Sequence, residues 1–168
     1  MTQPFLNWGD SHNYFLAPGG DMEGDLTAAG WSLTGGAGTV AGNESADVTG
    51  NPADSMSLDL PAGSSAMTPA ICVTAHDPEL RFFALSSGKK GGTLNVSAYF
   101  VGSDGKAHLK DLADVKGGSD WSVTDPVKFH DVIQPGPNGN GSVQFVFTPG
   151  DKGDWQIDDL YIDPLKSQ

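Results

Sequence analysis

The stretch Leu94-Asn95-Val96-Ser97-Ala98-Tyr99-Phe100 decides the fold class, because apolar side chains occupy every second position and leave a wetter set between them. A strand places successive side chains on opposite faces, so such a run has one dry face and one face toward solvent. The same alternation recurs over 56–60 and 142–147. No window of ten or more residues has the apolar spacing of an amphipathic helix without an interrupting Gly or Pro. The sequence therefore predicts an all-β protein with antiparallel sheets.

Turn-forming clusters separate the predicted strands. They lie, among other places, at residues 17–20, 35–36, 50–52, 61–63, 103–105 and 116–118. Within 103–105, the Asp-Gly pair tolerates the positive φ of a tight hairpin. This spacing leaves room for about ten short strands, and that number with short connections predicts two packed sheets or a barrel.

Acidic residues far outnumber basic ones: 9 Lys and Arg against 21 Asp and Glu give a formal charge of 9 − 21 = −12. This excess repels phosphate backbones and anionic lipid head groups, so we expect neither a nucleic-acid nor a membrane partner. The single cysteine, Cys72, cannot form an internal disulfide. A composition rich in Ser, Thr, Asn, Gly and Asp is typical of secreted modules. We therefore expect an extracellular or cell-surface location, with the secretory signal either absent or removed.

Residues 1–19 differ from the rest of the chain, because apolar side chains gather there before the first clear strand. These side chains are Phe5, Leu6, Trp8, Tyr14, Phe15 and Leu16. So many apolar groups would not remain in water. We expect residues 1–19 to form an arm that packs on its own sandwich or on a neighbouring subunit, and residues 20–168 to form a single β-sandwich domain.

The sequence contains none of the common catalytic motifs that we sought, which include a nucleophile elbow, a zinc-protease helix motif and a phosphate-binding loop. The four histidines, at positions 12, 76, 108 and 130, lack short ligand spacing, and we interpret them as surface or strand-end residues. Acidic residues are numerous, but no pair is singled out as the two carboxylates of a glycosidase. We therefore expect a protein that is not an enzyme.

Two short motifs stand near the ends of the chain. One is Gly20-Asp21-Met22-Glu23 followed by Gly30-Trp31, and the other is Gly-Asp-Trp-Gln-Ile-Asp-Asp-Leu-Tyr-Ile at 153–162. They resemble the N-terminal and C-terminal signatures of jelly-roll carbohydrate-binding modules of the galactose-binding-like type. The chain as a whole is most similar to uncharacterised actinobacterial jelly-roll proteins, through residues 16–23, 71–73, 81–83 and 153–164. The resemblance implies an antiparallel two-sheet β-sandwich with jelly-roll topology.

The resemblance also implies a structural calcium ion, which takes six to eight oxygen ligands. In the carbohydrate-binding relatives a first-strand Glu and a last-strand Asp hold this ion. These positions correspond here to Glu23 and to Asp158 or Asp159, while Asp21 stands where a backbone carbonyl usually binds. Strand alternation should direct one of the two neighbouring aspartates to the site, although a bulge could exchange them. The alternative is that Asp21 is a turn residue and that the Asp pair ends a strand.

A sugar-binding surface requires an exposed aromatic ring that stacks on the sugar and planar polar side chains that bind its hydroxyl groups. The candidates are Tyr99, Arg81, Gln144 and Asn95 on the wetter strand faces and Trp121 in a loop. Each also has a structural interpretation, since Tyr99, for example, could merely cover its sheet.

Two functions follow from these patterns. The first is a non-catalytic extracellular module that binds carbohydrate and contains structural calcium. The second is a self-assembling surface, fibre or adhesion subunit, a homo-oligomer in which the arm over 1–19 adds a strand to the open sheet edge of a neighbour.

Overall fold

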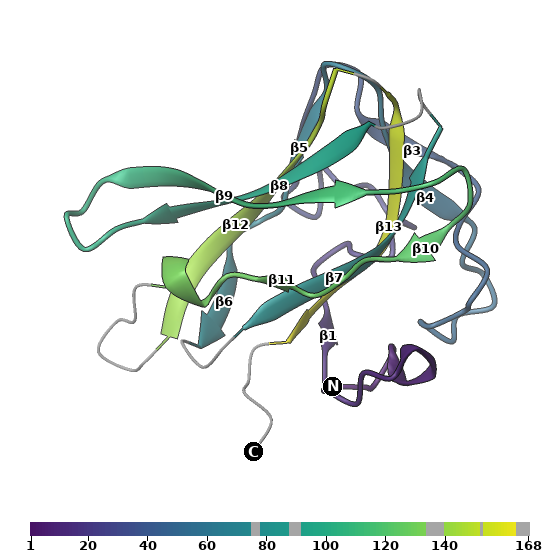
Figure 1. Cartoon of the computed structure of the whole chain (residues 1–168), viewed down its shortest axis with the longest axis horizontal. Coiled ribbons are helices and arrows are strands. Elements are labelled where there is room, and N and C mark those ends of the chain that lie inside the picture. Colours follow the sequence, from purple (N-terminus) through teal and green to yellow (C-terminus); the bar gives the residue numbers. More distant parts are fainter. Residues whose placement is uncertain (75–77, 88–91, 134–139, 152, 164–168) are drawn as a thin grey trace.

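The computed structural model describes residues 1–74, 78–87, 92–133, 140–151 and 153–163, and it consists of two antiparallel sheets packed face to face (Figure 1). The first sheet has the order β10-β7-β13-β4-β3, with β1 paired to β13 and β11 paired to β7. Its strands are β1 (Phe15–Leu16), β3 (Gly38–Ala41), β4 (Met56–Leu60), β7 (Glu79–Ser86), β10 (Ser122–Val123), β11 (Val127–Lys128) and β13 (Trp155–Asp163).

The second sheet has the order β2-β5-β12-β8-β9, with β6 paired to β12. Its strands are β2 (Ser32–Thr34), β5 (Ser65–Met67), β6 (Ile71–Thr74), β8 (Thr93–Val101), β9 (Ala107–Lys116) and β12 (Asn140–Pro149). Two short 3-10 helices, η1 (Leu6–Trp8) and η2 (His130–Val132), complete the described elements. Within these ranges no helix has the length and hydropathy that a membrane crossing requires.

The core lies between the two sheets and comes from the apolar positions of the alternating runs. Leu94 and Val96 of β8 and Phe145 and Phe147 of β12 are fully buried. Phe82 of the first sheet meets Phe147 edge to face, with ring centroids 5.3 Å apart. The prediction of an all-β antiparallel sandwich is confirmed. The described ranges contain thirteen strands instead of about ten, because several pairings are only two residues long.

The predicted hairpin at 103–105 joins β8 to β9. Gly105 has a φ of 73°, and the N–H of Gly102 donates to the carbonyl of Lys106 at 2.9 Å. The tight turn returns β9 along β8 and makes it an edge strand of the second sheet.

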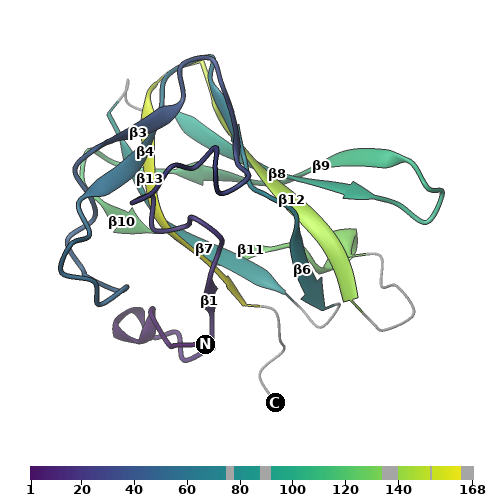
Figure 2. The ribbon, with the colours of Figure 1, turned by 180° about the vertical axis from the view of Figure 1, so that it is seen from behind.

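The N-terminal arm covers part of the outer face of the first sheet (Figure 2). Phe5 and Tyr14 are fully buried and form a second apolar cluster with Phe83 and Tyr161. The Phe5 ring lies edge to face with Tyr14 at 5.0 Å and with Tyr161 at 5.6 Å. The arm therefore buries these rings on its own sandwich.

Strand β13 changes its pairing partner partway along its length. Its first part pairs with β4 and its last part with β1, and a β-bulge between Asp158 and Tyr161 separates the two. Asp159, inside the bulge, has a φ of 51°. The N–H of Leu160 donates to the carbonyl of Gly20 at 2.9 Å, and a Cβ on Gly20 would lie only 2.6 Å from the Leu160 oxygen. Only a glycine therefore allows the chain before β2 to approach the bulge this closely.

Candidate metal centre and ligand surface

Two consecutive aspartates are fully buried at the bulge of β13. Asp158 accepts the N–H of Glu44 at 3.2 Å on Oδ2 and the N–H of Asp159 at 2.9 Å on Oδ1. The left-handed backbone at Asp159 resets the alternation, so that Ile157 and Leu160 both belong to the core. The bulge thus places both acids inside the protein, where regular alternation would have separated them.

The connection between β3 and β4 folds back toward the bulge and brings two more acids. Glu44 is buried, and Asp54 is half-buried. The Thr49 hydroxyl donates to Asp54 Oδ2 at 2.8 Å, and the Asn43 amide donates to the Asp54 carbonyl at 3.1 Å. The Glu44 carboxylate accepts the N–H of Ala46. These local hydrogen bonds hold the connection in place.

Glu23 reaches the same connection from the segment that follows β1. Its Oε1 accepts the N–H groups of Ser55 and Met56, at 2.6 Å and 2.5 Å. The preceding residue, Met22, is buried with a φ of 54°. A buried side chain at this backbone position directs the next residue toward the start of β4.

Four carboxylate oxygens in this cluster are buried and accept no hydrogen bond from an N–H or hydroxyl donor within the described ranges: both oxygens of Asp159, Oε1 of Glu44 and Oδ1 of Asp54. Asp159 instead faces the carboxyl group of Glu44, and Asp54 faces that of Glu23. A buried carboxylate without a donor is costly unless it is paired or binds a metal ion. The donor set consists of oxygen atoms, the ligands that hard cations such as calcium prefer. The chemical type of these donors therefore suits calcium, and backbone N–H groups hold Glu23 and Asp158 beside them. Among the described residues, the acids of this cluster do not bring three carboxylate oxygens within 4.8 Å of one another, so an ion would have to draw them together.

The sequence prediction of the metal ligands overlaps with this cluster in part. Asp158 and Asp159 lie in it, and Glu23 is bonded to the connection that carries Asp54. Asp21 is half-buried, and its charge acts on Asp54. Sequence reasoning missed Glu44 and Asp54, because their connection has no periodicity or ligand spacing. The one available signal is rarity, since Glu44 is one of only three glutamates in the chain.

The ionisation of these acids reflects their burial and mutual repulsion. Burial raises the pKa of Asp158 to about 8, and burial together with the charge of Asp158 raises the pKa of Asp159 to about 9. Burial also raises the pKa of Asp54. The hydrogen bond from the Thr49 hydroxyl lowers this pKa in part, and the charges of Glu23 and Asp21 raise it further. Without a cation, the cluster can keep its charge low only by holding protons.

In metal-free buffer we expect the free energy of unfolding to fall as the pH rises from about 4 to about 9. The pKa values of Asp158 and Asp159 in the folded chain lie above their ordinary value of 3.8. The folded chain therefore holds protons that the unfolded chain has already released in this window. The pKa of His12 is also raised, first by its hydrogen bond with Glu79. This histidine therefore also lowers the free energy of unfolding as the pH rises above its ordinary pKa of 6.5.

Thermal unfolding followed by circular dichroism across this pH series, in chelator, measures the effect. The variant Asp158→Asn should flatten the slope, whereas Asp120→Asn, at an exposed position outside the cluster, should leave it unchanged. A wild-type midpoint that rises steadily from acidic to alkaline pH would contradict the prediction.

A second candidate site lies on the outer face of the second sheet. Tyr99 of β8 and Gln144 of β12 are register partners and therefore lie side by side. The Tyr99 side chain is 38% exposed, and both residues line a shallow cavity of about 160 Å³ together with Ser142 and Val101. The Gln144 amide donates to the carbonyl of Thr68 at 2.9 Å, which holds its plane beside the ring.

Asn95 lies on the same outer face of β8, because residues two and four apart in a strand share a face. Its amide donates to Asp114 of β9 at 3.1 Å, and its oxygen accepts the Ser97 hydroxyl at 2.6 Å. The structure thus brings three of the predicted ligand residues, Tyr99, Gln144 and Asn95, to one sheet face.

The other two predicted ligand residues, Arg81 and Trp121, lie at the first sheet. Arg81 is 6% exposed and donates to the carbonyl of Thr124 from Nε at 2.9 Å and from Nη2 at 2.8 Å. Its Nη1 lies 2.7 Å from Asp10 Oδ2, and its guanidinium stands 4.8 Å from the centre of the Phe5 ring. Trp121 is half-buried and packs against the cluster that contains Phe5. Both side chains therefore support the packing of the arm.

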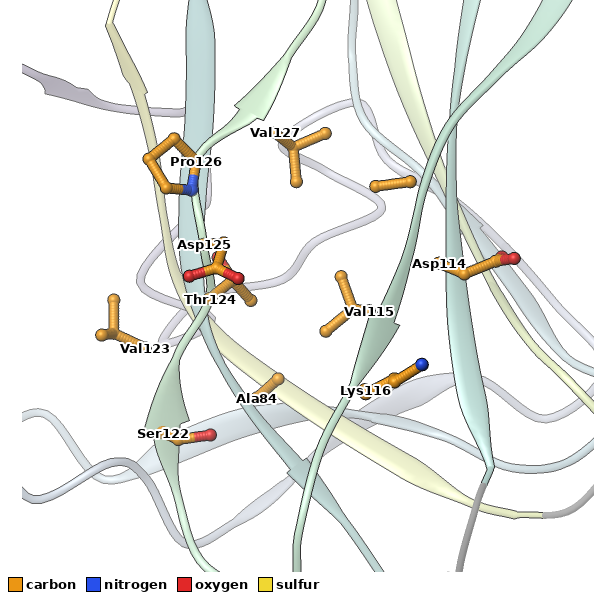
Figure 3. A pocket seen from close by; sticks show the side chains of 11 residues that line it. Ala84, Asp114, Val115, Lys116, Ser122, Val123, Thr124, Asp125, Pro126 and Val127 are labelled. Carbon is orange, nitrogen blue, oxygen red and sulfur yellow. The ribbon is translucent and has the colours of Figure 1, made fainter.

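A larger cavity, of about 300 Å³, opens between β9 and the segment of β10 and β11 (Figure 3). Val115 and Val127 project into it, whereas the carboxylate of Asp114 points away. None of its described lining residues is aromatic. It therefore lacks the ring on which a sugar would stack.

Comparisons with known proteins bear on the fold. No protein-family model matches the chain, and a comparison with curated proteins found no match. Among solved structures, the CBM22-1 xylan-binding domain of Paenibacillus barcinonensis Xyn10C is similar over 94% of this chain and 97% of its own, with a TM-score of 0.60 and 12% identity. The C-terminal family 22 carbohydrate-binding module of Clostridium thermocellum Xyn10B gives a TM-score of 0.57 and 13% identity over 93% and 94%.

TmCBM61, solved in complex with β-1,4-galactotriose, is similar over 89% of this chain and 97% of its own, with a TM-score of 0.51 and 16% identity. The chain has the fold of these modules. The predicted likeness to jelly-roll carbohydrate-binding modules is confirmed at the level of fold. The closer likeness to actinobacterial proteins stays a prediction.

Proposed function

We propose that this chain is a non-catalytic, extracellular carbohydrate-binding module with a structural calcium ion. The observation that carries the binding role is the exposed Tyr99 ring beside the Gln144 amide on an open sheet face. The ring offers a stacking surface for the C–H groups of a sugar, and the amide offers polar atoms for its hydroxyl groups. A fold shared with modules that are named as xylan-binding or solved with galactotriose supports this role.

The calcium ion is proposed at the carboxylates of Asp159, Glu44 and Asp54. These residues come from the bulge of β13 and from the β3–β4 connection, so one ion would tie together segments that are far apart in sequence. Tyr99 belongs to the other sheet. The ion is therefore a stabilising component and does not touch the sugar. Calcium sites of extracellular modules are filled at the millimolar calcium levels found outside cells, which is consistent with the proposed location.

The variant Tyr99→Ala is expected to weaken glycan binding by at least about tenfold, which corresponds to ~1.4 kcal/mol. The substitution removes the ring and leaves the flat backbone of β8, so the stacking surface is lost. Isothermal titration calorimetry with xylo-oligosaccharides, β-1,4-galacto-oligosaccharides and a broader glycan panel measures the affinity of the calcium-loaded protein.

Trp8→Ala serves as the matched control, because it removes another exposed aromatic ring, 41% exposed, from the arm on the other sheet. It should leave the glycan affinity unchanged, and Tyr99→Phe should retain most of it. Equal binding by wild type and Tyr99→Ala would place the sugar elsewhere. Silence of the folded, calcium-loaded wild type across the whole panel would overturn the binding role.

The alternative function, assembly through the arm, has no observation in its favour. The backbone of β1 pairs with β13 of the same chain, and Phe5 and Tyr14 are buried within it. An arm that donated a strand to a neighbour would have to release these contacts first.

A further inference from the structure

The N-terminal arm brings a histidine to a place where two buried acids face each other across neighbouring strands. Glu79 of β7 and Asp163 of β13 are register partners, and both side chains are buried. Like charges directly opposite each other in a sheet are destabilising. The arm packs Asp10 and His12 against this pair. Lys128, the partner of Glu79 on its other side, is exposed.

Asp10, His12 and Glu79 converge on one point, and Asp163 lies beside them. His12 Nδ1 lies 3.1 Å from Glu79 Oε1, 3.5 Å from Asp10 Oδ1 and 3.7 Å from Asp163 Oδ2. The ligand atoms of Asp10, His12 and Glu79 all lie within 4.8 Å of one another. In a tetrahedral site with zinc–ligand bonds of ~2.0–2.1 Å, neighbouring ligand atoms are about 3.3 Å apart. The three distances from the imidazole nitrogen lie on either side of this value.

Outer hydrogen bonds hold the carboxylates in this arrangement. Asp10 turns Oδ2 away from His12 toward Nη1 of Arg81, at 2.7 Å, and toward the Tyr14 hydroxyl, at 2.8 Å. The same hydroxyl lies 2.7 Å from Glu79 Oε1. Carboxylates that bind a metal ion are typically oriented by partners of this kind. Asp10 Oδ1 accepts the backbone N–H of His12 at 3.0 Å, which keeps this oxygen beside the imidazole nitrogen.

The three residues whose ligand atoms converge offer two carboxylates and one imidazole. A metal ion binds carboxylates in their charged form and an imidazole in its neutral form. Two carboxylates and one imidazole are ligand types that zinc takes in proteins.

We propose that Asp10, His12 and Glu79 form a binding site for one divalent transition-metal ion, of which zinc is the test case, with the Asp163 carboxylate beside it. The ion would join the arm to β7. An imidazole nitrogen among the donors suits zinc, nickel or copper, whereas calcium takes oxygen ligands. The site is thus chemically different from the oxygen-only cluster at the bulge, and it does not depend on the proposed sugar binding.

Titration of zinc chloride into the full chain, with calcium present in excess to fill the other cluster, tests the proposal. Calorimetry should show one equivalent of zinc bound, and zinc should raise the midpoint of thermal unfolding with increasing concentration. Cobalt(II) in place of zinc should give the strong visible absorption of a tetrahedral complex. The weak spectrum of hydrated cobalt, or no zinc binding by the folded chain at millimolar zinc, would overturn the proposal.

The variant His12→Gln should weaken zinc binding at least a hundredfold. His130→Gln is the matched control, because His130 is exposed and pairs with Asp131 at 2.7 Å outside the cluster. It should bind zinc as the wild type does. His76 lies outside the described residues, and zinc affinity equal to wild type in His12→Gln would place the metal there or at another surface histidine and overturn the proposal.

Tyr14→Phe separates metal binding from folding, because it keeps every proposed ligand and removes only an outer hydrogen bond. We expect zinc affinity to fall roughly 10- to 100-fold in this variant. Its midpoint in metal-free buffer shows whether the fold is retained. A folded Tyr14→Phe protein with unchanged zinc affinity would argue against the arrangement proposed here.

Discussion

Calcium added to the metal-free protein should raise the midpoint of thermal unfolding by roughly 8–16 °C when free calcium exceeds its dissociation constant about a thousandfold. At this concentration the ion contributes about 4 kcal/mol, and a chain of this length gains ~2–4 °C for each kcal/mol. The physical reason is that the ion supplies a partner to the buried oxygens of Asp159, Glu44 and Asp54. Differential scanning calorimetry in chelator and in calcium measures the shift.

We expect Asp159→Asn to stabilise the protein in chelator and to destabilise it in calcium. In chelator the variant should unfold at a higher temperature than wild type near neutral pH, because its amide is neutral without taking up the proton that Asp159 must bind on folding. In calcium it should unfold at a lower temperature, because a ligand is lost. Asp120→Asn, which removes an exposed charge, should shift with calcium as wild type does. An undiminished calcium shift in Asp159→Asn would remove the ion from this cluster.

Arg81→Ala is expected to lower the free energy of unfolding by about 3–5 kcal/mol, the range seen when one partner of a buried ion pair is removed. The variant loses two hydrogen bonds to the Thr124 carbonyl, the ion pair with Asp10 and the contact with the Phe5 ring. Urea denaturation monitored by tryptophan fluorescence measures the loss. Arg81→Lys should recover only part of it, because an ammonium group cannot reproduce the planar fork.

The same variant decides the role of Arg81. If the side chain anchors the arm, folded Arg81→Ala protein binds glycans with the affinity of wild type. A variant that is as stable as wild type and has lost glycan binding would return Arg81 to the ligand surface.

Local alternation was enough to predict the sandwich. The alternation of apolar and polar neighbours predicts that Leu94 and Val96 face the core, and the same holds for Phe145 and Phe147 in β12. The hairpin turn at Gly105 is equally local. The arm left two alternatives open, because its partners Phe83 and Tyr161 lie far away in sequence.

The sites were predicted less completely, because they depend on contacts between distant segments. Tyr99 and Gln144 were predicted from their wetter faces, and strand pairing brings them together. Arg81 sits on an equally wet-looking position, yet Asp10, 71 residues away, covers and pairs it. His12 has no ligand spacing in sequence, since Glu79 lies 67 residues away. No pattern read along a single strand could show either contact.

The closure of one sheet by the arm has a consequence for valency. Part of the outer face of the first sheet is covered by Phe5 and Tyr14, whereas the outer face of the second sheet carries the exposed Tyr99. A polysaccharide bound as proposed therefore meets one copy of this chain on one side only. A single copy holds one polymer strand and does not cross-link two. Linking several copies would then strengthen attachment to an insoluble polysaccharide, through the high effective concentration that linked binding sites create.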